Sequence, residues 1–209
     1  MPLFKTIRVN DFTKVCIWKI EESLEELHTN ISLNQRSLDR LEAMKSEIHQ
    51  KGFLSIRHLL AHEGYSDADL HYDEFGKPHL KDGNFISITH SGHYTGIIIS
   101  QKAPVGIDIE KQREKILRIA HKFTPLEEYR TIANTDALIR KLTIVWGGKE
   151  SLYKIYGKKK LLFLHHIYIE DFAFADEKTT GEIRFEGEFD NYDIHFLEFD
   201  DYTCVYAFQ

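Results

Sequence analysis

Two carboxylates in one short stretch have the spacing of a metal-binding strand. In residues 105–110, Asp108 and Glu110 alternate with apolar residues, and this period of two is typical of a β-strand whose alternate side chains share a face. Two carboxylates on one face repel each other, so the pattern favours a cation between them. A hard divalent ion, which prefers oxygen ligands, is the natural candidate.

A second stretch adds a third acid and a base. In residues 146–154, Trp146, Glu150 and Lys154 stand at i, i+4 and i+8, so a helix would place them on one face. Each stretch alone also fits an ordinary interpretation, as a solvated strand end or as an exposed charged helix. Gly147 and Gly148 disfavour a helix, and they indicate either the close approach of another backbone or a softened helix.

Taken together, the two stretches are similar to a known family pattern. The order G-I-D-I-E at residues 106–110, then W-G-G-K-E-S-L-Y-K at residues 146–154, resembles the 4′-phosphopantetheinyl transferase family. Upstream, F-G-K-P-H-L at residues 75–80 resembles the G-K-P segment of that family, and I-S-I-T-H-S at residues 86–91 resembles its N-x-S-H-S segment, with Ser87 at the Asn position. The chain resembles the longer, surfactin-synthetase-activating type.

The resemblance implies an α+β fold of two pseudo-symmetric α/β halves, each a small, mainly antiparallel sheet packed with helices. The N-terminal half, residues 1–102, would carry part of the coenzyme A site, and the C-terminal half, residues 103–209, would carry the metal and catalytic residues, with the cofactor cleft between them. The implied activity is that of a holo-[acyl-carrier-protein] synthase. It moves 4′-phosphopantetheine from coenzyme A to a serine of an apo acyl or peptidyl carrier protein, with Mg²⁺ or Mn²⁺, and releases adenosine 3′,5′-bisphosphate.

The resemblance also implies roles for single residues. Asp108, Glu110 and Glu150 would bind the metal, while Glu150 and Lys154 would act in catalysis. The expected coenzyme A contacts are Lys77, Thr89, His90, Ser91 and Arg57, of which His90 has the alternative of a core histidine. Arg57, together with Lys51, is a candidate for the 3′-phosphate, with a surface charge as the alternative.

Two other functions remain open. A metal-dependent coenzyme A or nucleotide phosphohydrolase would use the same acids to activate water, and it would act without a protein acceptor. A non-catalytic coenzyme A-binding module would have no need of Glu150 or Lys154. The His58 and His62 pair has zinc-like spacing, but no third ligand is evident in the sequence.

Charge and composition limit the partners. The net charge of −6 argues against a nucleic-acid binder, so an anionic partner would meet a local basic run. We predict Lys158, Lys159 and Lys160 for this run, with a solvated helix end favoured by the helix dipole as the alternative. No signal peptide and no membrane-spanning run is evident, which predicts a cytoplasmic protein, expected to be a monomer. Cys16 and Cys204 are expected to be buried free thiols.

Periodicity predicts the remaining elements. Asp190–Asn191 and Asp200–Asp201 are expected to be turns, Thr124 is expected to begin a helix, and a helix break is expected near Gly52. The expected strands are 14–20, 85–91, 96–100, 105–110, 167–169, 181–189, 192–199 and 204–208, and the expected helices are 21–28, two within 32–64, 111–123 and 136–156.

Overall fold

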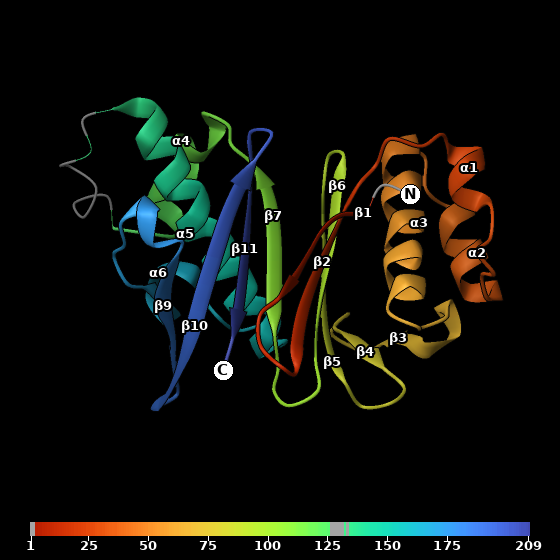
Figure 1. Cartoon of the computed structure of the whole chain (residues 1–209). Helices are drawn as coiled ribbons and strands as arrows, with labels where there is room; N and C mark the ends of the chain where they lie inside the picture. Colours follow the sequence, from red (N-terminus) through yellow and green to blue (C-terminus); the bar gives the residue numbers. More distant parts are fainter. Residues whose placement is uncertain (1–2, 126–131, 133) are drawn as a thin grey trace. The chain divides into compact units, whose positions relative to one another are not determined.

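The chain forms two compact units, Met1–Lys102 and Ala103–Gln209. The structure, a computed structural model, describes residues 3–125, 132 and 134–209 (Figure 1). Each unit contains one antiparallel sheet packed with helices, which confirms the α+β class. The sheets have six and five strands, and the pseudo-symmetry of the two halves stays a prediction.

The N-terminal unit is a six-stranded sheet in the order β1-β2-β6-β5-β4-β3. Its strands are β1 (Leu3–Arg8), β2 (Thr13–Lys19), β3 (Leu70–Tyr72), β4 (Pro78–Leu80), β5 (Phe85–Ser91) and β6 (Tyr94–Ser100). Its helices are α1 (Leu24–His28), α2 (Gln35–Glu42), α3 (Glu47–His62) and the short 3₁₀ helix η1 (Asp67–Asp69). The expected hairpin is confirmed, because β5 and β6 pair from Phe85↔Ser100 to Ser91↔Tyr94.

Helix α3 carries the core of this unit. Its apolar side chains Leu54, Leu59 and Leu60 are fully buried, and they belong to the same core cluster as Ile97 of β6. Helices α1, α2 and α3 lie on the same side of the sheet (Figure 1). Side chains of β5 that point toward α3 therefore lie against the surface of this helix, and His90 is one of them.

The predicted helix break at Gly52 is wrong. Helix α3 runs through Gly52, and the chain instead breaks between α2 and α3, where Ala43 ends one helix and Ser46 precedes the next. Strand β1 and the short elements η1, β3 and β4 were not predicted, because they carry mixed polar and apolar residues without a clear period.

The C-terminal unit is a five-stranded sheet in the order β7-β11-β10-β9-β8, packed with one long helix, α5. Its strands are β7 (Gly106–Lys111), β8 (Ile167–Ile169), β9 (Lys178–Phe185), β10 (Glu188–Phe199) and β11 (Tyr202–Phe208). Its helices are α4 (Lys115–Ile119), α5 (Thr135–Tyr156), α6 (Phe163–His166) and the 3₁₀ helices η2 (Ala120–Lys122) and η4 (Phe174–Asp176).

Glycine allows α5 to lie directly on the sheet. A Cβ added to Gly106 of β7 would lie 2.0 Å from the backbone oxygen of Ser151, and one added to Gly147 would lie 2.6 Å from Val205 Cγ2 of β11. Because α5 is continuous through Gly147 and Gly148, the glycines permit close approach rather than interrupt the helix. Helix α5 ends at Gly157, whose left-handed φ of 71° suits a glycine C-cap.

Two expected boundaries in this unit are wrong. The turn expected at Asp190–Asn191 lies inside β10, and the chain turns instead at Glu186–Gly187, where φ is 54° and 87°. Positive φ at both central residues is typical of the tight two-residue hairpin turn, and it also occurs in the expected turn at Asp200–Asp201. The helix expected over 111–123 begins later, because Lys111 still belongs to β7. The helix expected to start at Thr124 lies outside the described residues beyond position 125.

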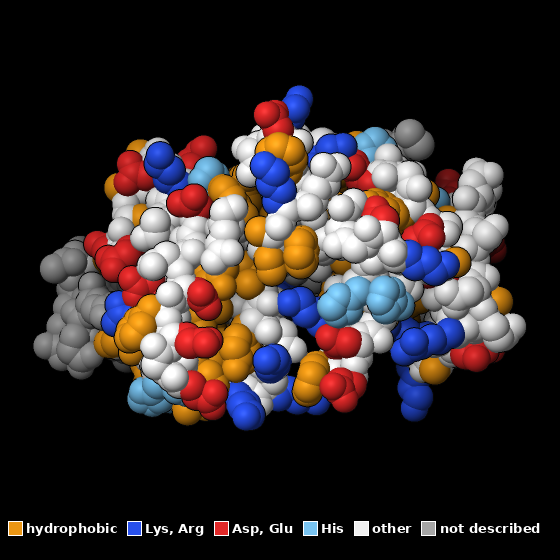
Figure 2. All heavy atoms as spheres, turned by 90° about the horizontal axis from the view of Figure 1, so that it is seen from below, with side chains coloured by type: hydrophobic (Ala, Val, Ile, Leu, Met, Phe, Trp, Pro, Cys, Tyr) orange, Lys and Arg blue, Asp and Glu red, His pale blue; other side chains and the backbone are white. Residues whose placement is uncertain are grey.

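The two cysteines are buried free thiols, as predicted, and the surface carries charges of both signs. Both cysteines are free and buried, Cys16 on β2 and Cys204 on β11. Lys and Arg side chains are interspersed with Asp and Glu on the face that Figure 2 shows, so charge of one sign is not gathered there. None of the described helices is both long and apolar enough to cross a bilayer.

The close approach of α5 to the sheet predicts an order of glycine substitutions. Gly106→Ala should destabilise the C-terminal unit most, by about 2–3 kcal/mol, because backbone atoms block the new methyl group. Gly147→Ala should destabilise it less, because alanine is the better helix former. Gly148→Ala, whose Cβ would lie 3.1 Å from the mobile end of Ile169, should be neutral or stabilising by up to about 1 kcal/mol.

Urea unfolding measures this order. The chain has two tryptophans, so a Trp18→Phe background leaves Trp146 on α5 as the fluorescent reporter of the C-terminal unit. Equal unfolding midpoints for the three variants would contradict the close approach of α5 to the sheet.

Candidate active site

An ion pair joins the first acid of β7 to the last base of the α5 motif. Lys154 Nζ lies 2.8 Å from Asp108 Oδ1 and donates a second hydrogen bond, of 2.7 Å, to the Ile107 carbonyl. Asp108 is buried, with 6% of its surface exposed. The structure therefore brings Asp108 and Lys154 together, although they are far apart in the sequence.

Glu110 also faces α5. The Trp146 indole donates a hydrogen bond to the Glu110 carboxylate, so the first residue of the helical stretch contacts the last acid of the strand stretch. Burial raises the pKa of Glu110, the negative charge of Asp108 raises it further, and Lys154 opposes both. Asp108 and Glu110 therefore share the face of β7 that packs on α5, as the alternation predicted.

Glu150 completes a group of three interacting carboxylates. Its burial, followed by the charge of Asp108, raises its pKa from 4.5 to about 7, while Lys154 lowers it and Glu110 raises it slightly. A carboxyl group with this pKa exists in both protonation states near neutral pH, which suits a general base. Trp146, Glu150 and Lys154 thus turn toward β7 from one face of α5.

Other residues of the α5 motif hold the helix in place. Lys149 is buried, and its ammonium donates to the Phe163 and Ile167 carbonyls at 2.7 Å and 2.5 Å. Ser151 Oγ donates to the Val205 carbonyl of β11 at 3.1 Å. The sequence did not reveal these roles, because Lys149 had the ordinary pattern of an exposed helix.

The acids fit a hard divalent cation by their chemistry. Burial, and after it the negative charge of Asp108, raises the pKa of both Glu110 and Glu150, and a bound cation would favour the charged forms of these acids. In the part of the chain that the structure describes, no three His, Cys, Asp or Glu side chains are arranged to hold a metal, and the Asp108 carboxylate is turned to Lys154. The donor set, rather than a preformed cage, is what suits a metal such as Mg²⁺.

A pocket of about 190 Å³ opens beside Glu110. Three cationic side chains, Lys111, Arg113 and Lys115, line it with Trp146. Arg113 lowers the pKa of Glu110 through its charge, so at least one of these cations acts on the acids directly. These basic residues were not predicted as part of the site, because they fall in the segment 111–123 that was expected to be an ordinary helix.

His90 lies at a pocket of the N-terminal unit. The pocket has a volume of about 270 Å³, and Arg40, His49 and Arg57 contribute to it together with His90 and Tyr72. Part of the His90 surface is exposed, but the ring packs on α3, and this burial lowers its pKa, with His49 adding to the effect. Cationic and aromatic side chains together suit a nucleotide phosphate and base. Arg40 and His49 belong to no recognisable motif, so they were not predicted.

Of the other expected coenzyme A residues, Arg57 also lines this pocket, whereas Lys77, Thr89 and Ser91 do not. His90 and Ile88 of β5 both line the pocket, whereas Thr89, between them, is buried and points away. Lys77 is half-buried in the turn before β4, where burial lowers its pKa and the charge of Asp73 raises it. Ser91 ends β5 and is half-buried.

Arg57 has a structural role instead of a surface one. It is 5% exposed and donates to Asp67 Oδ1 at 3.0 Å, to the Phe53 carbonyl and to Ser37, so its interpretation as a surface charge is wrong. Lys51, the other candidate, pairs with Glu47 at 2.9 Å.

The zinc-like histidine pair also has other contacts. His58 Nε2 lies 2.9 Å from the Leu27 carbonyl, and its ring stacks on Trp18. His62 lies 3.7 Å from Glu63.

Comparison with known proteins places this site in a family. The sequence model of the 4′-phosphopantetheinyl transferase superfamily matches residues 104–207, which include β7 and all of α5. The C-terminal unit therefore belongs to the 4′-phosphopantetheinyl transferase superfamily, and the resemblance read from the motifs is confirmed.

Individual relatives extend the likeness into the N-terminal unit. The 4′-phosphopantetheinyl transferase Sfp of Bacillus subtilis strain 168 is 30% identical over 148 residues, and the transferase ffp of Bacillus subtilis is 29% identical over 147 residues. Both alignments cover 66% of this chain and 65% of the relative, so the chain spans slightly less than two thirds of the length of these relatives. The transferase gsp of Aneurinibacillus migulanus is 30% identical over 100 residues, 47% of this chain and 42% of its own.

The raised pKa of Glu150 predicts a pH dependence of stability without divalent metal. A neutral Glu150 favours the folded state, so this contribution is complete below pH 4.5 and is lost as the pH rises through about 7. Glu150→Gln stays neutral, and above that range it should be more stable than the parent by up to about 3 kcal/mol. The difference should vanish toward pH 4.5, the usual pKa of this group.

Urea unfolding in EDTA at a series of pH values measures this difference. Glu188→Gln, on the exposed start of β10, is the matched control, and its curve should run parallel to that of the parent. A Glu150→Gln curve that also ran parallel would contradict the burial of Glu150 among acids.

Proposed function

We propose that the protein transfers 4′-phosphopantetheine from coenzyme A to a serine of an apo carrier protein and releases adenosine 3′,5′-bisphosphate. The observation that carries this proposal is the group of Asp108, Glu110 and Glu150 with Lys154, which lies in the part of the chain that belongs to the superfamily. Relatives named as 4′-phosphopantetheinyl transferases support it.

The residues of β7 and α5 suit the chemistry of this transfer. The serine oxygen would bond to the phosphorus on the pantetheine side of the pyrophosphate, and the bond from that phosphorus to the bridging oxygen would break. Glu150 would accept the serine proton, a role typically worth about 10²–10⁴-fold in rate. Lys154 would stabilise the negative charge on the phosphates.

A divalent metal is part of the proposal. Asp108, Glu110 and Glu150 would hold Mg²⁺ or Mn²⁺. The bound ion would neutralise charge on both phosphates. The rise in the pKa of Glu110 and Glu150, caused by burial and then by the charge of Asp108, supports this role, because a cation would stabilise their charged forms.

The N-terminal unit would contribute to coenzyme A binding. His90, with Arg40 and His49 of the same pocket, would meet the nucleotide half, and Lys77 would add a cation near β4. Thr89 and Ser91 would contribute to coenzyme A binding at the end of β5. Arg57 would support the pocket wall through its ion pair with Asp67. The monomeric state and the cytoplasmic location belong to the same proposal.

A direct assay tests the reaction. The protein, coenzyme A, Mg²⁺ and apo acyl or peptidyl carriers should give phosphopantetheine on the carrier serine by intact-protein mass spectrometry, with an equal amount of adenosine 3′,5′-bisphosphate. Glu150→Gln should lower kcat by about 10²-fold or more, a much larger factor than the rise in the KM for coenzyme A.

Either of two results would contradict the proposal and favour another function. Hydrolysis of coenzyme A with every carrier unmodified would favour the phosphohydrolase. Binding of coenzyme A without either reaction would favour the non-catalytic binding module.

Removing one acid should uncouple coenzyme A binding from the metal. Asp108→Asn keeps an acceptor for Lys154 but loses the charge, so calorimetry should show that Mg²⁺ no longer strengthens coenzyme A binding. Asp193→Asn, an exposed change on β10 of the same sheet, should keep the Mg²⁺ effect. An unchanged Mg²⁺ effect in Asp108→Asn would place the metal elsewhere.

The basic run after α5 would meet the carrier. Lys158, Lys159 and Lys160 are exposed beyond the Gly157 cap, where the helix dipole also favours cations. Lys158 lines a pocket with the acidic side chains Glu186, Glu188 and Asp190, which reduce its net attraction for an acidic partner. Reversal of all three lysines to Glu should raise the KM for the carrier several-fold and weaken its salt dependence.

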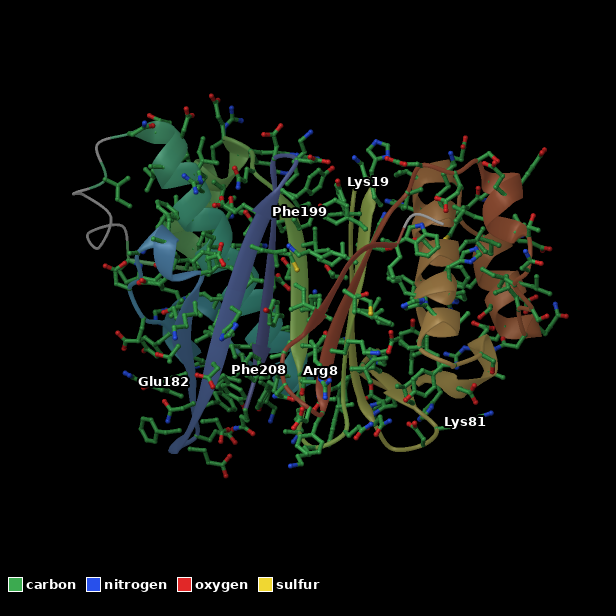
Figure 3. All side chains as sticks on the ribbon, in the orientation of Figure 1. Arg8, Lys19, Lys81, Glu182, Phe199 and Phe208 are labelled. Carbon is green, nitrogen blue, oxygen red and sulfur yellow. The ribbon has the colours of Figure 1, made fainter. Side chains whose placement is uncertain are left out.

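A second triple reversal separates electrostatic steering of the carrier by residues 158–160 from the general effect of a changed net charge. Lys5, Lys45 and Lys81 are exposed lysines of the N-terminal unit, and Lys81 projects outward near the end of β4 (Figure 3). Their reversal to Glu changes the net charge equally, and it should leave the KM for the carrier closer to the parent value. Equal effects of the two reversals would refute a specific role for residues 158–160.

A further inference from the structure

Gly52 stands in the middle of α3, where glycine is a poor helix former. The residue is buried, and the helix passes through it without interruption from Glu47 to His62. Alanine would form the same helix with less loss of backbone entropy. The presence of glycine at position 52 is therefore explained by a contact that leaves no room for a side chain, not by the needs of the α3 backbone.

The contact is the imidazole of His90. A Cβ built on Gly52 would lie 2.5 Å from Nε2, 2.6 Å from Cδ2 and 2.8 Å from Cε1 of His90, so the ring covers the position that a side chain would occupy. At Gly147 and Gly148, by contrast, the nearest atoms belong to apolar core side chains. The His90 ring lies at the far end of a rotatable side chain, so it would give way where the backbone would not.

Two neighbours complete the setting of this ring. His90 Nε2 lies 3.2 Å from the Gly92 carbonyl, which can only accept, so Nε2 carries a proton and Nδ1 remains for another partner. The His49 ring of α3 stands edge-on to His90, with 6.0 Å between the ring centroids. The position of the imidazole is therefore set from α3 at Gly52, with His49 beside it, and from the turn at Gly92.

We propose that Gly52 is a positioning residue for His90, which keeps the imidazole seated on α3 at the wall of the pocket of the N-terminal unit. The inference rests on the proposed function in one respect, that the ligand of this pocket is the nucleotide half of coenzyme A. A side chain at position 52 would push the ring off the helix and toward the pocket that both residues line.

The test is Gly52→Ala, with Gly52→Ser as a second variant that carries the same Cβ. Both should leave the urea unfolding midpoint unchanged or, for alanine, raised, because the helix gains a better helix former. Calorimetry should show coenzyme A binding weakened at least fivefold, and kcat at saturating coenzyme A should change less than twofold.

A double-mutant cycle with His90→Ala identifies the mechanism. Once the imidazole is absent, Gly52→Ala should no longer weaken coenzyme A binding. An equal loss in the presence and absence of His90 would overturn the inference, because Gly52→Ala would then act by filling the pocket. Unchanged binding in Gly52→Ala, in a protein whose affinity depends on His90, would overturn it as well.

The ring position can also be measured without a ligand. The histidine ring signals in proton–carbon NMR spectra should shift for His90 in Gly52→Ala and stay unchanged for His79, which pairs with His71 of β3 and lies 3.1 Å from Asp73. If coenzyme A failed to bind even the parent protein, the proposed function would fail, and this spectrum would still decide the position of His90. Unshifted His90 signals would overturn the inference.

Discussion

The ion pair between Lys154 and Asp108 joins the two elements on which the site is built. It requires α5 to lie almost on the backbone of β7, and a Cβ at Gly106 would meet the Ser151 oxygen at 2.0 Å. Burial of a charged carboxylate costs free energy unless the carboxylate is paired, and Lys154 is the partner that stabilises buried Asp108. For Glu150, burial and the charge of Asp108 outweigh the effect of Lys154 and raise the pKa to about 7. The close approach and the ion pair thus depend on each other.

Local pattern predicted the elements that carry the chemistry. The alternation around Asp108 placed both acids of β7 on one face, and the helical spacing of Trp146, Glu150 and Lys154 placed them together on α5. These two periods are set by backbone geometry alone, so they can be read without knowing the fold. The sequence left open what the glycines of α5 do, and the packing against Val205 answers it.

Tertiary contacts decided what the sequence could not. Arg57 looks like a surface charge in an amphipathic pattern, but its partner Asp67 lies in a separate element, the 3₁₀ helix η1, and no local rule links the two. The turn at Glu186–Gly187 was missed because Asp190–Asn191 has the stronger turn composition, although the pairing of β9 with β10 extends from Glu188↔Phe185 through those residues. Arg40 and His49 enter the pocket beside His90 only through the packing of the helices.

Helix glycines in both units have the same physical explanation. Propensity predicts a break at Gly52 and a weak point at Gly147, yet α3 and α5 are continuous at both. In each case the missing Cβ is replaced by atoms of a strand residue, the His90 ring from β5 or the Val205 methyl group from β11. A glycine inside an otherwise good helix sequence therefore indicates where a strand comes closest. Gly52 and Gly147 lie beside residues assigned to the proposed reaction, His90 and Asp108, whereas Gly148 lies beside Ile169 and Ile194 of the apolar core.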